Sequence, residues 1–338
     1  MLRTRKAGLS PRSVCSPLPS TDFNGRSRKS SSNSFYRVRL SEMLGPTSLL
    51  SRLHCGRRRL GDRSGDGLRF PLCSGGNSTP NTTYKFYNEN GLDSRQHLEH
   101  YLSDNPEIAF GEDIVEFPVK NLLKTFTDGH IKGDVLIDIS PGSMVHHLFA
   151  ACEYFKHIIV LKSRDTCIME LKRWVDERTG AFDWRHATKL HVDVNGNSDQ
   201  LQDKEGKVRS ALQHVVKCDL EKENIMDPII LPLADCIICA WLLDAICKDQ
   251  DDYTRYLKKV SKLLKPGGHI ILIGSLDVTY VTVGKHKFHS FNYDEDFARK
   301  SVAREGFIID RCEVKKRMVV SDLTDYKAII FIAAHKEK

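Results

Sequence analysis

The stretch LIDISPGSM, residues 136–144, decides the fold. Apolar residues lead to an acid, Asp138, and a turn of small residues follows, which is how a nucleotide-binding βα unit begins. Such loops usually carry two or three glycines, whereas this one offers Ser140, Pro141 and a single glycine, Gly142. Gly142 lets a ligand approach the backbone, but Pro141 has no N–H to offer. The stretch predicts a cofactor-binding loop in which Asp138 orients the backbone or accepts a ligand donor.

From about residue 94 onward the chain alternates helical and strand patterns, which is typical of an α/β domain with a mostly parallel sheet. The predicted strands are 135–139, 157–161, 189–194, 235–243 and 269–276, with a terminal pair at 307–314 and 328–336; the predicted helices are 114–126, 145–155, 166–180, 201–214, 251–264 and 294–306. Asn195 and Gly196 predict a turn, and the run from Lys265 to Gly268 predicts a sharp stop. We therefore expect a Rossmann-like fold, a twisted sheet with helices on both faces and an antiparallel terminal strand.

The positive charge of the chain is concentrated in its first quarter. Residues 1–80 carry 15 Lys and Arg against 4 Asp and Glu, whereas the remaining residues carry 36 against 40. The Arg- and Ser-rich segment has too little apolar surface to offset its ordering entropy, so a disordered extension is expected over residues 1–80 and one folded domain over residues 81–338. Because the folded part carries no excess of basic residues, the sequence argues against an enzyme that acts on nucleic acid.

Targeting signals are sparse in the sequence. No uncharged apolar run approaches the roughly 18 residues needed to span a bilayer, and no secretory segment is visible. We expect a soluble cytoplasmic protein that does not bind membranes. Mitochondrial import through the Arg- and Ser-rich segment is the alternative.

Cysteines, histidines and tryptophans give no metal or redox motif. Cys236 and Cys239 fall in a predicted strand that points them to opposite faces, so we interpret them as buried apolar residues. Four histidines, His146, His147, His286 and His289, lack a helix-spaced partner with a nearby carboxylate and are expected on the surface or in loops. The two tryptophans Trp174 and Trp184 are expected to pack in the core.

Basic residues follow the second predicted strand, in LKSRD at 161–165. Ribose-binding βα folds place an acid there to accept the ribose hydroxyls, but Lys162 has only donors. Asp165 comes three residues later and is not expected to replace that acid. Losing two charge-assisted hydrogen bonds costs on the order of 3 kcal/mol, about a hundredfold in affinity. Basic residues after this strand also suit a 2′-phosphate, so NADP is an alternative ligand, although GxGxxG is missing.

Two further segments point to an adenosine-bearing cofactor. In VVKCDL, residues 215–220, an acid directly after an apolar segment suits the exocyclic amine of adenine. In LKPGGHIILIG, residues 264–274, a Lys-Pro-Gly-Gly turn leads from a helix into a buried strand. This order, with a terminal strand pair after it, is what the sheet of adenosylmethionine-dependent methyltransferases looks like.

The chain from about residue 94 to its end resembles the small-molecule N-methyltransferase family that includes nicotinamide, indolethylamine and phenylethanolamine N-methyltransferases. The matching phrases are IKGDVLIDI, ACEYFKHIIV, ELKRWV, GAFDW, the Asn195-Gly196-Asn197 turn, VVKCDL, LPLADCI, KLLKPGGHI and VGKHKF. The resemblance implies a class I methyltransferase fold with S-adenosyl-L-methionine as cofactor and a small amine or pyridine as methyl acceptor. It also implies in-line transfer that depends on positioning, so no catalytic residue and no metal are assigned. We expect a monomer.

The resemblance implies two sets of site residues. Cofactor-binding positions are Tyr101, Asp138, Ser140, Pro141, Gly142, His146, Lys162, Cys167, Asp219, Leu220 and Ala240, and substrate positions are His97, Gly274, Tyr280 and Ser290. Several of these depart from the family pattern. Lys162 stands where the family has the ribose-binding acid, and Cys167 stands where it has an amide. Ala240 replaces a common threonine, and His146 replaces a tyrosine. Gly274 stands where the nicotinamide enzyme has a carboxylate.

These departures leave two functional hypotheses. The first is an N-methyltransferase with an altered cofactor site. The second is a catalytically weak or inactive member of the family that acts as a binding or regulatory protein.

If the ribose acceptor is the missing contact, Lys162→Asp is expected to tighten the binding of adenosylhomocysteine at least several-fold, because it restores a carboxylate at that position. Calorimetric titration of both proteins checks this. An unchanged affinity would mean that the site is built around the lysine.

Overall fold

The computed structural model describes residues 84–103, 111–128, 131–195, 201–318 and 321–337. The extension predicted over residues 1–80 lies outside the described residues, and so does Gly196 of the predicted turn.

The elements follow one another in βα order. They are α2 (Tyr87–Asn90), α3 (Ser94–Tyr101), the π-helical turn η1 (Gly111–Glu116), α4 (Phe117–Thr127), β1 (Gly133–Ile139), α5 (Leu148–Ala151), β2 (Phe155–Lys162), α6 (Asp165–Val175), α7 (Arg185–Asn195), α8 (Leu201–Ala211), β3 (Leu212–Lys217), β4 (Ala234–Ala240), α9 (Leu242–Ile246), α10 (Gln250–Ser261), β5 (Leu264–Leu276), β6 (Tyr280–Val283), β7 (His286–His289), α11 (Glu295–Arg304), β8 (Phe307–Lys316) and β9 (Ala328–Lys336).

Seven of the strands form one sheet in the order β3-β2-β1-β4-β5-β9-β8. Strands β1 to β5 pair in parallel, whereas β9 runs antiparallel to both β5 and β8. The strand order reverses between β1 and β4, so the carboxyl ends of these two strands border the crevice where open α/β sheets bind ligands. The sheet confirms the predicted Rossmann-like architecture and its antiparallel terminal strand.

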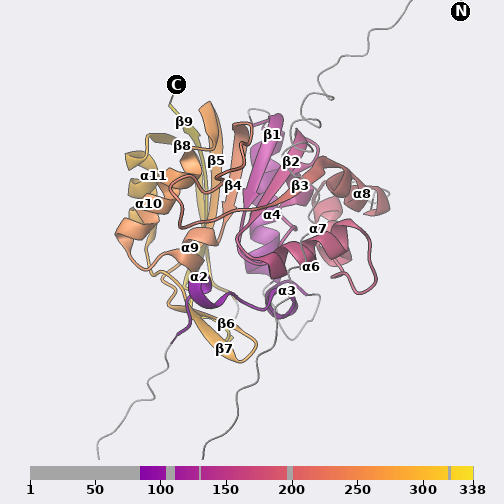
Figure 1. The fold of residues 1–338 in the computed structure, drawn as a ribbon, viewed down its shortest axis with the longest axis horizontal. Coiled ribbons are helices and arrows are strands. Elements are labelled where there is room, and N and C mark those ends of the chain that lie inside the picture. The colour runs from indigo at the N-terminus through magenta and orange to yellow at the C-terminus, as the bar shows by residue number, and fades with distance from the viewer. Residues whose placement is uncertain (1–83, 104–110, 129–130, 196–200, 319–320, 338) are drawn as a thin grey trace, which may run out of the picture. The chain divides into compact units, whose positions relative to one another are not determined.

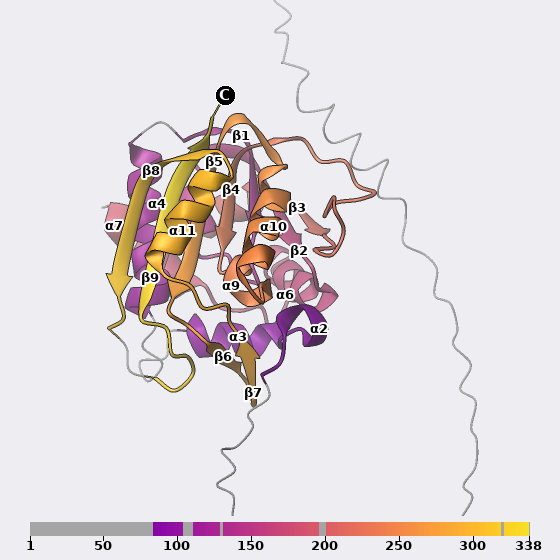
Figure 2. The same ribbon diagram turned by 90° about the vertical axis from the view of Figure 1, so that its left-hand side faces the viewer.

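Helices cover both faces of this sheet (Figures 1 and 2). Helices α9, α10 and α11 pack on one face, and α4, α5, α7 and α8 pack on the other. The small hairpin β6–β7 and the helices α2 and α3 lie together beyond the carboxyl ends of the parallel strands. The sequence patterns did not predict this hairpin, which forms a separate two-stranded sheet.

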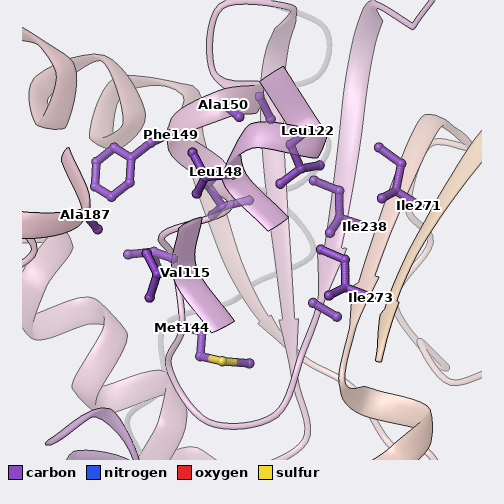
Figure 3. Packing of buried hydrophobic residues seen from close by; sticks show 14 of the residues in the cluster. Val115, Leu122, Met144, Leu148, Phe149, Ala150, Ala187, Ile238, Ile271 and Ile273 are labelled. Atoms are coloured by element: carbon purple, nitrogen blue, oxygen red, sulfur yellow. The ribbon is translucent and has the colours of Figure 1, made fainter. Parts of the chain in front are cut away.

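Alternating residues of the strands supply the two cores. Leu136 and Ile238 pack with the α4 face, where Figure 3 shows Ile238 near Leu122, whereas their neighbours Ile137 and Ile237 pack with the α10 face. This alternation is the period of two expected of a pleated strand. Both faces are apolar because a parallel sheet is buried on both sides.

One predicted strand is wrong. Residues 189–194 lie in helix α7, and the third strand of the parallel series is β3, residues 212–217. The buried side chains at Ala187, Thr188, His191 and Val192 have helical spacing, and this face packs against the core. Tertiary packing on that face outweighs the alternation that favoured a strand.

Several element boundaries differ from the prediction. The helix expected over 201–214 ends at Ala211, and the strand expected over 235–243 ends at Ala240. The helix expected over 145–155 is reduced to α5, because turns occupy the residues before it. The π-helical turn η1 ends at Glu116, and Pro118 lies in the first turn of α4, where proline is tolerated. The Lys-Pro-Gly-Gly run is a bulge within β5 and not a separate turn, with a register shift opposite Ala234 and Cys236.

The aromatic and cysteine predictions are confirmed. Trp174 and Trp184 are buried. Cys236 and Cys239 are also buried and belong to opposite core faces. Within the described ranges no group of histidine, cysteine and acidic side chains is arranged to hold a metal ion. No helix in the part of the chain that the structure describes is long and apolar enough to cross a membrane.

Burial raises the pKa of both strand thiols well above its usual value. Because the thiolate is the reactive form, Cys236 and Cys239 are expected to resist alkylation in the native protein. Peptide mass spectrometry after timed exposure to a maleimide measures this, with the half-buried Cys152 and Cys312 as internal comparisons. Rapid native labelling of Cys236 or Cys239 would contradict their burial.

Candidate functional site

The loop after β1 forms the floor of the candidate site. Its residues from Ser140 to Met144 are buried, and Gly142 adopts a left-handed conformation with φ of 63°. A Cβ at Gly142 would lie 2.7 Å from Nδ1 of His97, so the α3 histidine rests directly on the loop backbone. Both the positive φ and this close approach require glycine at this position.

A buried carboxylate holds the beginning of this loop. Oδ1 of Asp138 lies 2.5 Å from Nε2 of His147, which donates to it, and Oδ2 accepts a hydrogen bond of 3.2 Å from Ser140 Oγ. Burial alone would raise the pKa of Asp138, but His147 and the Lys162 ammonium outweigh burial and hold it below its usual value. Asp138 therefore orients the loop by contacts within the protein.

Lys162 extends from the end of β2 into this network and is 1% exposed. Its Nζ donates to the main-chain oxygen of Ser140 at 3.0 Å and to Ser140 Oγ at 2.8 Å, and it lies 3.7 Å from Oδ2 of Asp138. Burial lowers the pKa of this lysine, and Asp138 opposes that effect. The ammonium thus ties β2 to the loop after β1 and offers no acceptor for a ribose.

The other basic residues after β2 are engaged as well. Arg164 donates to the main-chain oxygens of Tyr87 and Asn88, and Lys217 pairs with Asp165 at 2.7 Å. Asp165 is exposed and does not turn toward the ribose position, as the sequence led us to expect. The cations that suggested a 2′-phosphate site are occupied by the protein itself, which removes the support for NADP.

A hollow beside the ends of β2 and β3 contains the predicted adenine pair. Asp219 and Leu220 line it together with Ser163 and Cys218. One oxygen of the Asp219 carboxylate accepts the N–H of Glu221 at 3.1 Å, which fixes the carboxylate at the rim. The arrangement suits an amine donor held beside an apolar wall.

A second, more apolar cavity lies on the other side of the loop, beneath the β6–β7 hairpin. Its walls carry Tyr87, Leu92, His97, Tyr101, Ile114, Pro141, Met144, Trp241, Asp244, Ala245, Ser275, Val281, Val283, Phe288, His289, Ser290, Thr324 and Tyr326. The predicted residues His97, Tyr101, Pro141 and Ser290 therefore meet in one cavity. Tyr101 is fixed by its hydroxyl, which donates to the main-chain oxygen of Thr282.

Asp244, at the start of α9, is the carboxylate of this apolar cavity. Its Oδ2 accepts the main-chain N–H of Ser275 at 2.6 Å, and its Oδ1 accepts the hydroxyl of Tyr293 at 2.8 Å. No ion pair involves Asp244 within the described ranges. Burial raises the pKa of Asp244 to about 7, against the two hydrogen bonds, which lower it. A buried carboxylate without a cation is the pattern expected where a ligand brings the charge.

Sequence reasoning missed four residues of the site. Tyr87 is buried, and its hydroxyl interacts with the side chain of Ser163 and the backbone of Gly142. The others are Asp244, Tyr293 and His147. None of the four stands in a local motif, so the sequence offered no signal for them.

Several predicted site residues lie elsewhere. Tyr280 is half-buried on β6 and donates from its hydroxyl to the main-chain oxygen of Asp322, outside the cavity. Gly274 lies behind Asp244. The other two, Cys167 and Ala240, are buried, and the main-chain oxygen of Cys167 accepts a hydrogen bond from Ser143.

The expectation of surface histidines is wrong for His146 and His147, which are fully buried. His146 stacks on Trp184 at 6.1 Å between ring centroids and lies 6.2 Å from Trp241, so it packs behind the loop. Burial holds the pKa of His146 well below its usual value. His286 is exposed, as expected, whereas His289 is half-buried on β7 and lines the apolar cavity, against the expectation of a surface or loop position.

Comparison with known proteins gives a consistent assignment. A model of the NNMT/PNMT/TEMT family matches residues 82–337. Nicotinamide N-methyltransferase of Homo sapiens is 33% identical over 242 residues, which cover 72% of this chain and 92% of that protein. Indolethylamine N-methyltransferase of Mus musculus is 30% identical over the same shares of the two chains, and phenylethanolamine N-methyltransferase of Homo sapiens is 27% identical over 70% of this chain and 85% of its own.

Lys162→Met is expected to lower the free energy of unfolding by about 3 kcal/mol or more, because it leaves a buried carboxylate without its ammonium neighbour. Denaturant unfolding measures the loss. Lys217→Met is the matched control, because Lys217 is the register partner of Lys162 in the β2–β3 pair. The ion pair of Lys217 with Asp165 is exposed, so we expect its removal to lower the free energy of unfolding by less than about 1 kcal/mol. Equal losses would show that the buried ammonium adds nothing. Lys162→Asp is expected to cost at least as much, since its carboxylate would face that of Asp138.

Proposed function

The chain belongs to the NNMT/PNMT/TEMT family, and from that premise we propose that it is an S-adenosylmethionine-dependent N-methyltransferase of a small amine or pyridine. The observation that supports this most directly is Asp244, a single buried carboxylate in an apolar cavity beside the loop after β1. Apolar cavities with one convergent polar group are typical of small-molecule sites.

The residues present fit the cofactor at the adenine end of the site. The hollow with Asp219 and Leu220 suits adenine, because the carboxylate can accept the exocyclic amine beside an apolar wall. The cavity beyond the loop offers Tyr101 and Met144 near the acceptor.

The middle of the cofactor site is different. Lys162 cannot accept the ribose hydroxyls, and its donors are used by Ser140. His97 and Tyr87 contact the backbone of Gly142 and line the apolar cavity, whereas neither lines the hollow at Asp219. We therefore expect cofactor affinity below that of a site with a ribose-binding acid, by about a hundredfold.

When bound, S-adenosylmethionine supplies an electrophilic methyl group on its sulfonium. The protein then has to hold a neutral nitrogen against that methyl and exclude water. Asp244 can pair with an ammonium and accept its proton, because its pKa of about 7 lies near the working pH. The side chains of Trp241 and Phe288 form apolar walls that keep water from the reacting nitrogen.

Asp244→Asn is expected to lower kcat/KM for an alkylamine acceptor about a hundredfold, since it removes the charge that meets the ammonium. Transfer of labelled methyl to a panel of pyridines, indolethylamines and phenylethanolamines measures the activity. In the wild type kcat/KM is expected to rise with pH through about 7, as Asp244 ionises, and the Asn variant is expected to lack that break.

The control for this assay is Asp277→Asn. Asp277 is an exposed carboxylate just beyond β5 with φ of 51°, a conformation that asparagine also tolerates, so activity is expected to be unchanged. Absence of transfer from the folded wild type to every acceptor would favour the hypothesis of a catalytically inactive binding protein.

A further inference from the structure

Three elements converge on the carboxylate of Asp244. Its side chain projects from α9, the Ser275 N–H comes from β5, and the Tyr293 hydroxyl comes from the segment between β7 and α11. Each carboxylate oxygen thus has one donor. The main-chain oxygen of Asp244 is also bound, because it accepts the N–H of Phe291 at 2.8 Å.

Gly274 makes room for this arrangement. A Cβ at position 274 would lie 2.2 Å from the Tyr293 hydroxyl oxygen and 2.9 Å from Oδ1 of Asp244. Real Cβ atoms do not approach other heavy atoms so closely, so any side chain at 274 would displace the hydroxyl or the carboxylate. Its φ is not positive, so the requirement for glycine is one of space and not of backbone conformation.

The ring of Tyr293 is fixed by aromatic neighbours. Its centroid lies 5.3 Å from Tyr253, 5.7 Å from Phe291 and 6.1 Å from Phe297, and the side chain is buried. Such contacts leave the ring little freedom. The hydroxyl is therefore held at one place, between Gly274 and the carboxylate.

Among the described side chains that affect the pKa of Asp244, none is a cation. The titratable groups whose charge influences that of Asp244 are Cys239 on β4, Cys247 after α9, Tyr253 on α10 and Tyr293, and burial raises the pKa of each, so they are uncharged near neutral pH. Two histidines, His97 and His289, line the same cavity as Asp244, and burial lowers the pKa of both, which favours their neutral form. Burial therefore raises the pKa of this carboxyl, and the hydrogen bonds from Ser275 and Tyr293 orient the carboxylate and lower its pKa.

We propose that Tyr293 is a positioning residue: its hydroxyl, placed in the space that Gly274 leaves free, orients the Asp244 carboxylate toward the nitrogen of the methyl acceptor. This inference rests on the proposed function, since it assigns Tyr293 a role through Asp244 in acceptor binding. Tyr293 does not line the cavity and so acts on the acceptor only through that carboxylate.

The first test needs no turnover. In Tyr293→Phe the carboxylate loses a donor that favours its ionised form, so the pKa of Asp244 is expected to rise by about one unit. Titration of ¹³C-labelled aspartate by NMR measures it, with Asp244→Asn to assign the signal. The matched control is Tyr253→Phe, which removes a buried hydroxyl from the adjacent ring but not a donor to Asp244. Equal titrations in the two variants would overturn the proposal.

A second test examines the space at position 274. Gly274→Ala is expected to destabilise the wild type strongly and to cost distinctly less in the Tyr293→Phe background, where the hydroxyl is absent. Denaturant unfolding of the four proteins measures the difference. If Gly274→Ala costs the same in both backgrounds, Tyr293 and Gly274 do not share this space.

Activity separates this inference from the proposed function. If methyl transfer occurs, Tyr293→Phe is expected to lower kcat/KM for an alkylamine about tenfold in the wild type and to have no effect in the Asp244→Asn background. A wild type that transfers no methyl, with the titration shifted as expected, contradicts the proposed function but supports the contact. Transfer with an unshifted titration contradicts the positioning role alone.

Discussion

The buried ammonium of Lys162 is the interaction on which the candidate site depends. It crosses from β2 to Ser140 and neutralises Asp138, whose other oxygen is bound by His147. Buried charges are tolerated only when they are paired and hydrogen-bonded, so these groups fix one another's positions. These contacts hold the beginning of the loop after β1 in place, and Pro141 and Met144 of that loop line the apolar cavity.

The two buried carboxylates of the site have opposite environments. Asp138 has an internal ammonium and an imidazole, which lower its pKa, whereas Asp244 has only two neutral donors, and burial raises its pKa to about 7. Environments that separate the pKa values of two acids mark different roles. Asp138 belongs to the scaffold, and Asp244 is the group suited to meet a ligand's positive charge and proton. The lysine that stands in place of a ribose-binding acid thus stabilises the loop after β1.

Much of the site could be predicted from short motifs, and its polar network could not. Asp138 lies near the end of β1, and Gly142 and Asp219 come within a few residues of the carboxyl ends of β1 and β3, where apolar segments in the sequence end. Asp244 and Tyr293 follow no such pattern, because their contact joins residues 49 positions apart. Helix α7 was mispredicted for the same reason. Its alternating residues suggested a strand, whereas the packing of its helical face against the core, which involves distant segments, favours a helix.

The sequence by itself determined the α/β class, the parallel sheet with its antiparallel end, and the family to which the chain belongs. These depend on hydrophobic periodicity and on contiguous motifs, which are local properties. Only the tertiary structure decided that Lys162 turns inward to Ser140, that His147 is buried against Asp138, and that Gly274 leaves its space to Tyr293. The physical reason is that a buried charge is stabilised by whichever partners the fold brings to it, and those partners come from distant segments that no local pattern connects.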